Sequence, residues 1–343
     1  MSMIKFIIRR FFTLLPVLFG VITLTFILSR LMPGDPILAH LPKEFTSEMY
    51  YDMLKQLGLD KPILEQFVVY LGELFTGRWG VSVSLAKGTP VWDLVLVRFF
   101  RTFDIALLSI IIATFIGLKT GVISATHRNK PKDTILRGFA LVGVAIPVFW
   151  MGMMLQYLLA YQIPIFPAIG YKTAGIGDPP VITHLRIIDC ILAFDMVLLF
   201  DYIQHLILPV LCLSFITLAS ITRQTRSSML EVLGQDYVRT ARAKGCKEKD
   251  VIKTHARKNA LIPTITIIGL NFGGLLSGAI LTETTFNLHG LGELLIVCIQ
   301  NTDYWVLNGI VFVTTLTFIT INLSIDLIYG FIDPRVRQKG RDS

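Results

Sequence analysis

The stretch that decides the fold runs from Ile105 to Thr126 and reads IALLSIIIATFIGLKTGVISAT, with Lys119 as its single charged residue. At about 1.5 Å of rise per residue, a helix of this length spans a hydrocarbon core of about 30 Å. A helix also satisfies its own backbone hydrogen bonds, which lipid cannot do. We therefore expect a transmembrane helix with Lys119 near its cytoplasmic end, where the long side chain carries the ammonium group to water.

The composition extends this interpretation to the whole chain. Of the 343 residues, 53% are hydrophobic and only 16% are charged, whereas soluble domains carry about 25% charged residues. A net charge of +8 is typical of basic cytoplasmic loops, so we expect no nucleic-acid partner. The four cysteines are scattered, and neither GxxxxGKS/T, HExxH nor GxSxG occurs. We therefore expect an integral membrane protein that is not itself an enzyme and binds no cofactor or metal.

Similar apolar runs predict six transmembrane helices. The first run, Phe11 to Ser29, resembles a signal peptide, but it is longer than a usual signal core and no cleavage pattern follows, so we interpret it as a retained span. Pro147 is expected to bend the third helix. The predicted spans are residues 11–32, 105–126, 138–161, 204–222, 260–282 and 306–332.

The remaining regions set the domain organisation and the orientation. The mostly polar residues 33–102 suggest an external cap of short helices. Within 162–204, an apolar piece that contains Asp189, Asp195 and Asp201 favours an interfacial or re-entrant segment. Basic segments at both termini, at 127–137 and at 223–258 all fall on one side of six spans, which the positive-inside rule assigns to the cytoplasm. The chain divides into 1–32 with the N-terminal tail and first helix, 33–102 as the cap, and 103–343 as a five-helix core in the cell's inner membrane.

The basic segment 223–262 has a helical pattern of its own. Asp236 is placed to cap a helix that runs to Lys244, and Gly245 suits the left-handed residue that ends it. A second helix from Glu248 presents an apolar stripe on one face. Two short helices at a glycine corner form a rigid docking surface, and a solvated loop against anionic lipid headgroups is the alternative. The stripe consists of Val251, Ile252, His255 and Ala256.

Polar residues inside or next to the apolar runs are candidates for a substrate path. An ionised Asp facing lipid costs at least about 2.5 kcal/mol, so the polar face of the sixth span must look at protein or water. It forms either a substrate path or a clamp between helices, and we favour the clamp. Asn271 lies among glycines that indicate close helix packing, and Glu283 either meets substrate or caps a helix. The glycines are Gly269, Gly273, Gly274 and Gly278, and the polar face consists of Asn322, Asp326, Tyr329 and Asp333.

The segment around Gly245 resembles the coupling-loop signature of binding-protein-dependent ABC importer permeases. Its core is a triplet, a Gly and a downstream Pro, here Arg239-Thr240-Ala241, Gly245 and Pro263. The triplet lacks a Glu and the Gly-to-Pro distance is long, and both departures are shared with the peptide/nickel branch of the family. The resemblance implies that seven residues contact an ATPase subunit: Asp236, Arg239, Thr240, Ala241, Ala243, Gly245 and Pro263.

The resemblance covers nearly the whole chain, because further pieces follow in the order and spacing of the oligopeptide/dipeptide branch. It is weakest over residues 172–204. The pieces are Arg9-Arg10, Leu31 to Pro36, Gly77 to Ser82, Gly88 to Val91, Ile146 to Trp150, Glu283 to Asn287, Gly290 to Gly292, Asp303-Tyr304 and Asp333 to Arg335.

Membership of this family implies a type I ABC importer permease fold and a division of labour. A homologous second permease completes the path, two ABC ATPases bind ATP and Mg²⁺, an external binding protein delivers substrate, and lipid surrounds the spans. The substrate would be an oligopeptide or dipeptide, with nickel or oligosaccharides as alternatives. A stand-alone ion-coupled carrier is the competing interpretation. It expects ionisable groups at the bilayer midplane, whereas Lys119 and Asp326 lie nearer the predicted cytoplasmic ends.

Overall fold

Helices are the regular elements of the computed structural model, which describes residues 3–332 apart from 32–34, 36, 39–40 and 43. Within those residues, the only strand-like pairing is an isolated bridge between Val81 and Pro90. The elements are α1 Met3–Leu31, α2 Ser47–Gln56, α3 Ile63–Thr76, α4 Val91–Thr126, α5 Pro131–Ala145, α6 Val148–Gln156, η1 Tyr157–Gln162, α7 Arg186–Leu192, α8 Met196–Leu233, α9 Asp236–Ala243, α10 Glu248–Asp250, η2 Val251–Ala256, α11 Arg257–Gly278, α12 Ile280–Phe286, α13 Leu291–Gln300 and α14 Tyr304–Ile332.

Five helical stretches of the described chain are long and apolar enough to cross a membrane, and a bent pair makes a sixth. The pair is α5 with α6–η1, whose axes meet at 99°. Pro147 lacks a backbone N–H, and Ile146 before it is extended, so the helix stops at Ala145 and restarts at Val148. The predicted bend is confirmed, and it is a full break. The five straight stretches are Ile8–Leu31, Val91–Thr126, Met196–Leu233, Glu248–Ser277 and Tyr304–Ile328.

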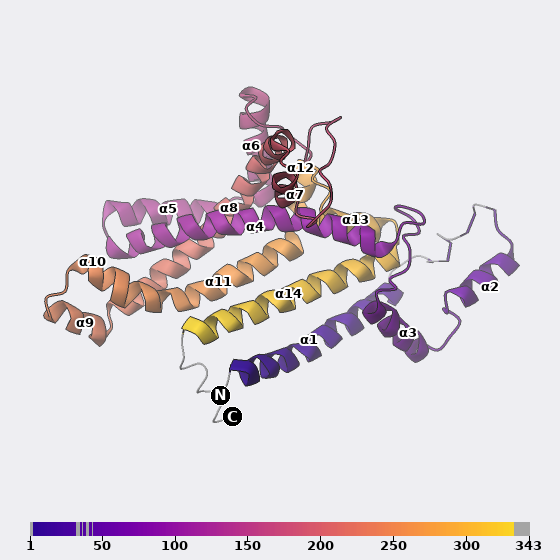
Figure 1. The fold of residues 1–343 in the computed structure, drawn as a ribbon, viewed down its shortest axis with the longest axis horizontal. Helices are drawn as coiled ribbons and strands as arrows, with labels where there is room; N and C mark the ends of the chain where they lie inside the picture. Colours follow the sequence, from indigo (N-terminus) through magenta and orange to yellow (C-terminus); the bar gives the residue numbers. More distant parts are fainter. Residues whose placement is uncertain (1–2, 32–34, 36, 39–40, 43, 333–343) are drawn as a thin grey trace.

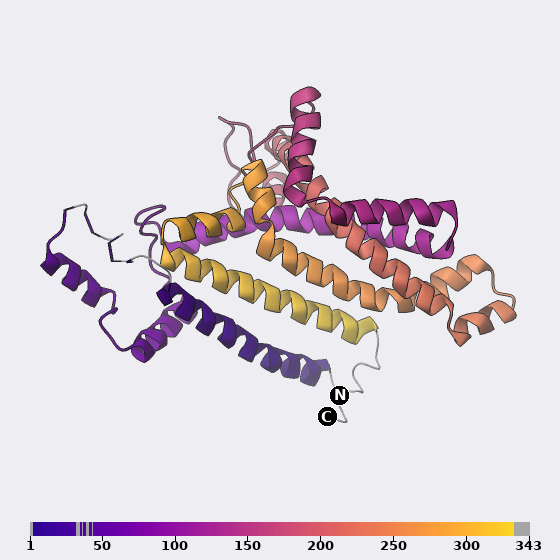
Figure 2. The same cartoon turned by 180° about the vertical axis from the view of Figure 1, so that it is seen from behind.

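The long helices run roughly along one direction, and α6 leaves them steeply (Figures 1 and 2). Helices α9 and α10 lie at one extremity, which we call the hairpin end, and α2 lies at the other. The start of α1 and the end of α14 both point toward the hairpin end. The described chain thus enters and leaves the helical layer on the same side, as an even number of spans requires.

Helix α4 begins at Val91, well before the predicted start of the second span at Ile105. The expected boundary between cap and core at residue 102 therefore falls inside a helix. Charged residues near this boundary are compatible with the helix because they have partners. Arg98, for example, donates to the carbonyl of His289 at 2.7 Å.

Helix α8 is also longer than the predicted fourth span, 204–222, and it includes the first part of the expected basic loop. Asp195 caps its start through the N–H of Leu198. Asp201 does not break the helix, because Thr173 donates to it from both its backbone N–H and its hydroxyl. The segment before α8, which the structure describes throughout, is an irregular loop followed by the short helix α7, and its interfacial or re-entrant position stays a prediction.

Glycines allow close helix packing, for example between α4 and α8 and between α11 and α14. A Cβ on Gly117 or Gly121 of α4 would stand 2.9 Å or less from side chains of α8. Similarly, Gly269 and Gly273 of α11 lie against α14, and a Cβ on Gly269 would overlap Ile325. The predicted packing is confirmed for these two α11 glycines, whereas Gly274 faces open space.

Candidate coupling segment and substrate path

Two helices and a glycine corner form the hairpin, as the sequence predicts. Gly245 has a φ of +76°, in the left-handed region that favours glycine. Arg242 and Glu248 close the corner with an ion pair of 2.8 Å. The predicted cap is wrong in detail. Gln235 occupies the cap position and Asp236 is the first helical residue, where a carboxylate interacts favourably with the helix dipole.

The hairpin has a buried face and an exposed face. Val238, Ala241 and Val251 pack with the last residues of α8 and are 0%, 7% and 0% exposed. The predicted stripe therefore points inward, with Val251 and Ala256 fully buried. Four candidate residues share the outer face of α9, and with Gly245 they are exposed: Asp236, Arg239, Thr240 and Ala243. Ala241 is buried instead, and Pro263 lies apart from the corner, inside α11.

A partly buried ion pair between α8 and α5 was not predicted from the sequence. Arg226 of α8 donates to both oxygens of Asp133 of α5, at 2.8 and 2.9 Å. The Ser124 hydroxyl of α4 and the N–H of Asn129 also donate to this carboxylate, which is 0% exposed. The pair joins α4, α5 and α8 at one point. The sequence feature that could have indicated this pair is the single aspartate, Asp133, in an otherwise basic segment.

The sixth-span candidates lie between α1 and α14. Asp326 forms an ion pair of 3.0 Å with Arg10 of α1. Asn322 donates to the carbonyl of Phe318 in its own helix at 2.9 Å. This geometry fits the clamp interpretation, and a role in transport stays a prediction. The side chain of Tyr329 and all of Asp333 lie outside the described residues, as do most of Leu31 to Pro36 and all of Asp333 to Arg335.

Asn271 lies in α11, and its Nδ2 is buried without a hydrogen-bond partner among the described residues. A buried amide donor without an acceptor costs about 1–3 kcal/mol. A partner for this donor therefore lies outside the described residues or is water. Asn271 thus stays a candidate for contact with another subunit or with substrate.

Glu283 occupies the corner between α12 and α13 and is 0% exposed. The Thr102 hydroxyl donates to its Oε1 at 2.6 Å, and the N–H of Glu293 donates to its Oε2 at 3.0 Å. A Cβ on Gly290 would collide with the carboxylate, and a Cβ on Gly292 would collide with Ile280. Burial raises the pKa of Glu283, although the Thr102 hydrogen bond and backbone N–H groups oppose the rise. In this structure Glu283 is a buried centre that holds the corner together.

Two separate pieces of the family pattern also meet. Asp303 accepts hydrogen bonds from the hydroxyl of Ser82 at 2.7 Å and from the N–H of Val83 at 3.0 Å. Gly80, in the left-handed region, lies against Trp305. The loop before α4 is therefore fastened to the start of α14.

These features define an all-helical membrane protein whose apolar helices carry an exposed charged hairpin at one end. The chain belongs to the family of binding-protein-dependent transport system inner membrane components. The family model matches residues 117–338, and a model for the N-terminal part of such components matches residues 3–106. The predicted permease family is confirmed, and the stand-alone carrier is set aside.

Relatives match along their whole length. The chain is 40% identical over 340 residues to the dipeptide transport system permease protein DppB of Escherichia coli strain K12, covering 98% of this chain and 100% of the relative. It is 41% identical over 339 residues to the di/tripeptide transport system permease protein DppB of Pseudomonas aeruginosa, with coverage of 98% and 100%. The oligopeptide transport system permease protein AppB of Bacillus subtilis is 34% identical, with coverage of 97% and 99%.

A solved structure supports the fold. A chain of the inward-facing MetNI methionine ABC transporter aligns with a TM-score of 0.53 at 14% identity, covering 71% of this chain and 98% of that chain. At this identity the similarity concerns the fold alone. The expected ABC importer permease fold is thereby confirmed.

Proposed function

We propose that this chain is one of two membrane-spanning subunits of an ATP-driven importer of short peptides. The observation that carries the coupling role is the hairpin, which is anchored to α8 by buried Val238 and Val251 and exposes the outer face of α9. The full-length similarity to dipeptide, di/tripeptide and oligopeptide permeases supports the peptide substrate. The hairpin end faces the cytoplasm, together with both termini.

In this mechanism an ABC ATPase subunit, which binds ATP and Mg²⁺, receives the exposed face of α9. Its closure moves the hairpin, and the hairpin moves α8. The Asp133–Arg226 pair transfers the displacement to α4 and α5. A homologous second permease moves in the same way, so that the path opens toward an external binding protein loaded with substrate.

The first experiment is mild purification of the complex from native membranes through a C-terminal tag. We expect a second permease and nucleotide-binding subunits to co-purify, with ATP hydrolysis in the eluate. A stable single polypeptide that is inert toward ATP would contradict the proposal.

Gly245→Asp tests the hairpin directly. A side chain there strains the left-handed corner and adds a charge to the docking surface, so we expect peptide uptake to be lost while membrane insertion is unchanged. Gly77→Asp is the matched control, because Gly77 has a φ of +74° and equally open surroundings but ends α3, away from the hairpin. Normal uptake by Gly245→Asp would exclude the docking role.

A further inference from the structure

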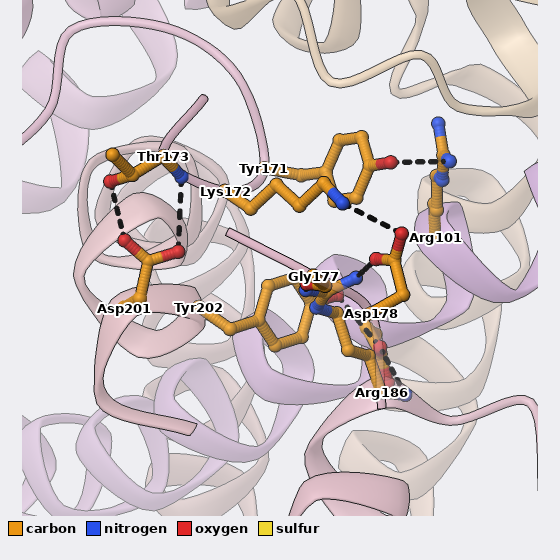
Figure 3. A network of polar contacts seen from close by, with 10 residues as sticks. Arg101, Tyr171, Lys172, Thr173, Gly177, Asp178, Arg186, Asp201 and Tyr202 are labelled. Atoms are coloured by element: carbon orange, nitrogen blue, oxygen red, sulfur yellow. Dashed lines mark hydrogen bonds and ion pairs between the residues drawn. The ribbon is translucent and has the colours of Figure 1, made fainter. Parts of the chain in front are cut away.

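A cavity of about 270 Å³, with several charged residues on its wall, lies over the N-terminal halves of α4 and α8, where the loop before α7 covers them. Arg186 on its wall is neutralised by Asp178, which also pairs with Lys172 at 2.6 Å (Figure 3). These three residues fasten the covering loop. Two other charged residues of the cavity, Asp104 and Arg101, have no such partner among the described residues.

Asp104 is 4% exposed, and only one of its oxygens is occupied. Oδ2 accepts from the Tyr202 hydroxyl at 2.8 Å and from the N–H of Arg186 at 3.3 Å. No described residue donates to Oδ1, and no described cation pairs with the carboxylate. A buried carboxylate without a counter-charge is costly, and in a membrane helix it marks a functional site whose partner is to be found.

Arg101 lies one turn earlier on α4. Its Nη2 donates to the Tyr171 hydroxyl at 2.9 Å, and its guanidinium stacks on the Tyr171 ring, 3.9 Å from the centroid (Figure 3). No described carboxylate pairs with it. Residues three apart on a helix are neighbours, about 5–6 Å apart at Cβ. Nη1 of Arg101 also donates to the His289 carbonyl at 3.4 Å. The cavity therefore offers a carboxylate and a guanidinium that have no ion-pair partner among the described residues, and Asp189, which is 3% exposed and accepts only from Thr183 in the described part of the chain, adds negative charge.

We propose that this cavity is a substrate subsite for a short zwitterionic peptide, with the α-ammonium at Asp104 and the α-carboxylate at Arg101. The inference rests on the proposed function and adds that this chain binds the two charged ends of the peptide. An ammonium group supplies the donors that Oδ1 lacks, and a carboxylate matches the planar guanidinium fork. The volume is near the lower end for ligand pockets, which suits a dipeptide.

The test uses the assembled transporter without its binding protein. Val97 lines the cavity and is 47% exposed, so Val97→Cys gives a thiol whose modification by a maleimide is followed by mass spectrometry. We expect L-alanyl-L-alanine to slow modification. N-acetyl-L-alanyl-L-alanine, without the ammonium, and L-alanyl-L-alaninamide, without the carboxylate, should each be weaker by about tenfold.

Charge-neutral variants then assign each end of the peptide. With Asp104→Asn, the dipeptide and its acetylated form should protect equally, while the amide remains weaker. With Arg101→Gln, the dipeptide and its amide should protect equally. Asp303→Asn is the matched control, because Asp303 is 1% exposed but is held by Ser82 and Val83 and does not line the cavity. This variant should keep both preferences.

The outcomes separate the subsite from the proposed function. If the complete transporter with its binding protein imports labelled dialanine but the three peptides protect the thiol introduced by Val97→Cys equally or not at all, the subsite is wrong and the importer stands. If it imports no peptide, both fail. The peptide series needs no change at Asp104, so it decides the matter even where Asp104→Asn does not assemble.

Discussion

At the scale of single residues, Glu283 explains why two glycines follow it at fixed spacing. The carboxylate takes the space where a side chain of residue 290 would lie, and Ile280 takes that of residue 292, so the helix corner and the glycines form one unit. Hydrophobic patterning placed Glu283 at a helix end but could not show its depth, because depth depends on Thr102, far away in the sequence. A substrate contact and a helix cap therefore stayed equally open.

Gly290→Ala should destabilise the protein by about 1–3 kcal/mol, since a methyl group forced against the buried carboxylate overpacks the corner. Its φ of −85° is ordinary, so backbone strain plays no part. Thermal unfolding of the purified protein in detergent measures the effect. Gly138→Ala, in α5 with open space around its Cβ, serves as the control and should leave the midpoint unchanged or raise it. Equal stability of the two variants would contradict this account of the corner.

At the scale of elements, the Asp133–Arg226 pair joins α8, which leads into the hairpin, to α5 and α4. Asp133→Asn should destabilise by up to about 3 kcal/mol, because it leaves Arg226 without its counter-charge. We expect ATP hydrolysis by the complex to continue with little peptide uptake. Parallel assays of hydrolysis and uptake check this. Glu65→Gln, which breaks the exposed Lys61–Glu65 pair, should change neither stability nor uptake. Proportional loss of both activities in Asp133→Asn would argue against a role in coupling.

Exchange of the charges of Arg10 and Asp326 can distinguish a clamp between α1 and α14 from a substrate path. Exchange of the charges, Arg10→Asp with Asp326→Arg, should restore assembly and uptake that each single change reduces, because a clamp needs only opposite charges. Uptake and complex yield are measured for the two single variants and the double variant. A double variant that assembles but does not transport would assign Asp326 to the path.

Element lengths were the part of the fold that the sequence predicted least well. The ends of α4 and α8 carry Arg98, Asp104 and Asp201, and each charge weakens the hydropathy signal of a span. Their partners lie on the His289 carbonyl, on Tyr202 and on Thr173, which no local pattern reveals. The glycine corner and the Pro147 break depend on one residue each and were therefore predictable.

At the scale of the whole molecule, the orientation in the membrane is the main expectation left to measure. Cys246 is exposed on the hairpin, and the other three cysteines are buried. A membrane-impermeant maleimide should label Cys246 in inverted vesicles and not in intact cells. Lys130→Cys, in the α4–α5 loop, should behave in the same way, whereas Lys87→Cys, in the loop before α4, should label from outside. The opposite pattern would reverse the orientation.

The length of α8 has a thermodynamic consequence. This one helix of 38 residues, about 57 Å long, carries Tyr202 of the cavity beneath the loop before α7 in its first turns and Arg226 in its last turns. If a ligand at one end of α8 and a partner at its other end prefer different positions of the helix, they shift the same conformational equilibrium in opposite directions. Linkage is reciprocal. If ATPase closure lowers the affinity of the cavity for its ligand by a certain factor, an occupied cavity lowers the equilibrium constant of closure by the same factor. Release of the ligand from the cavity and reopening of the ATPase subunits would then report on the same conformational equilibrium.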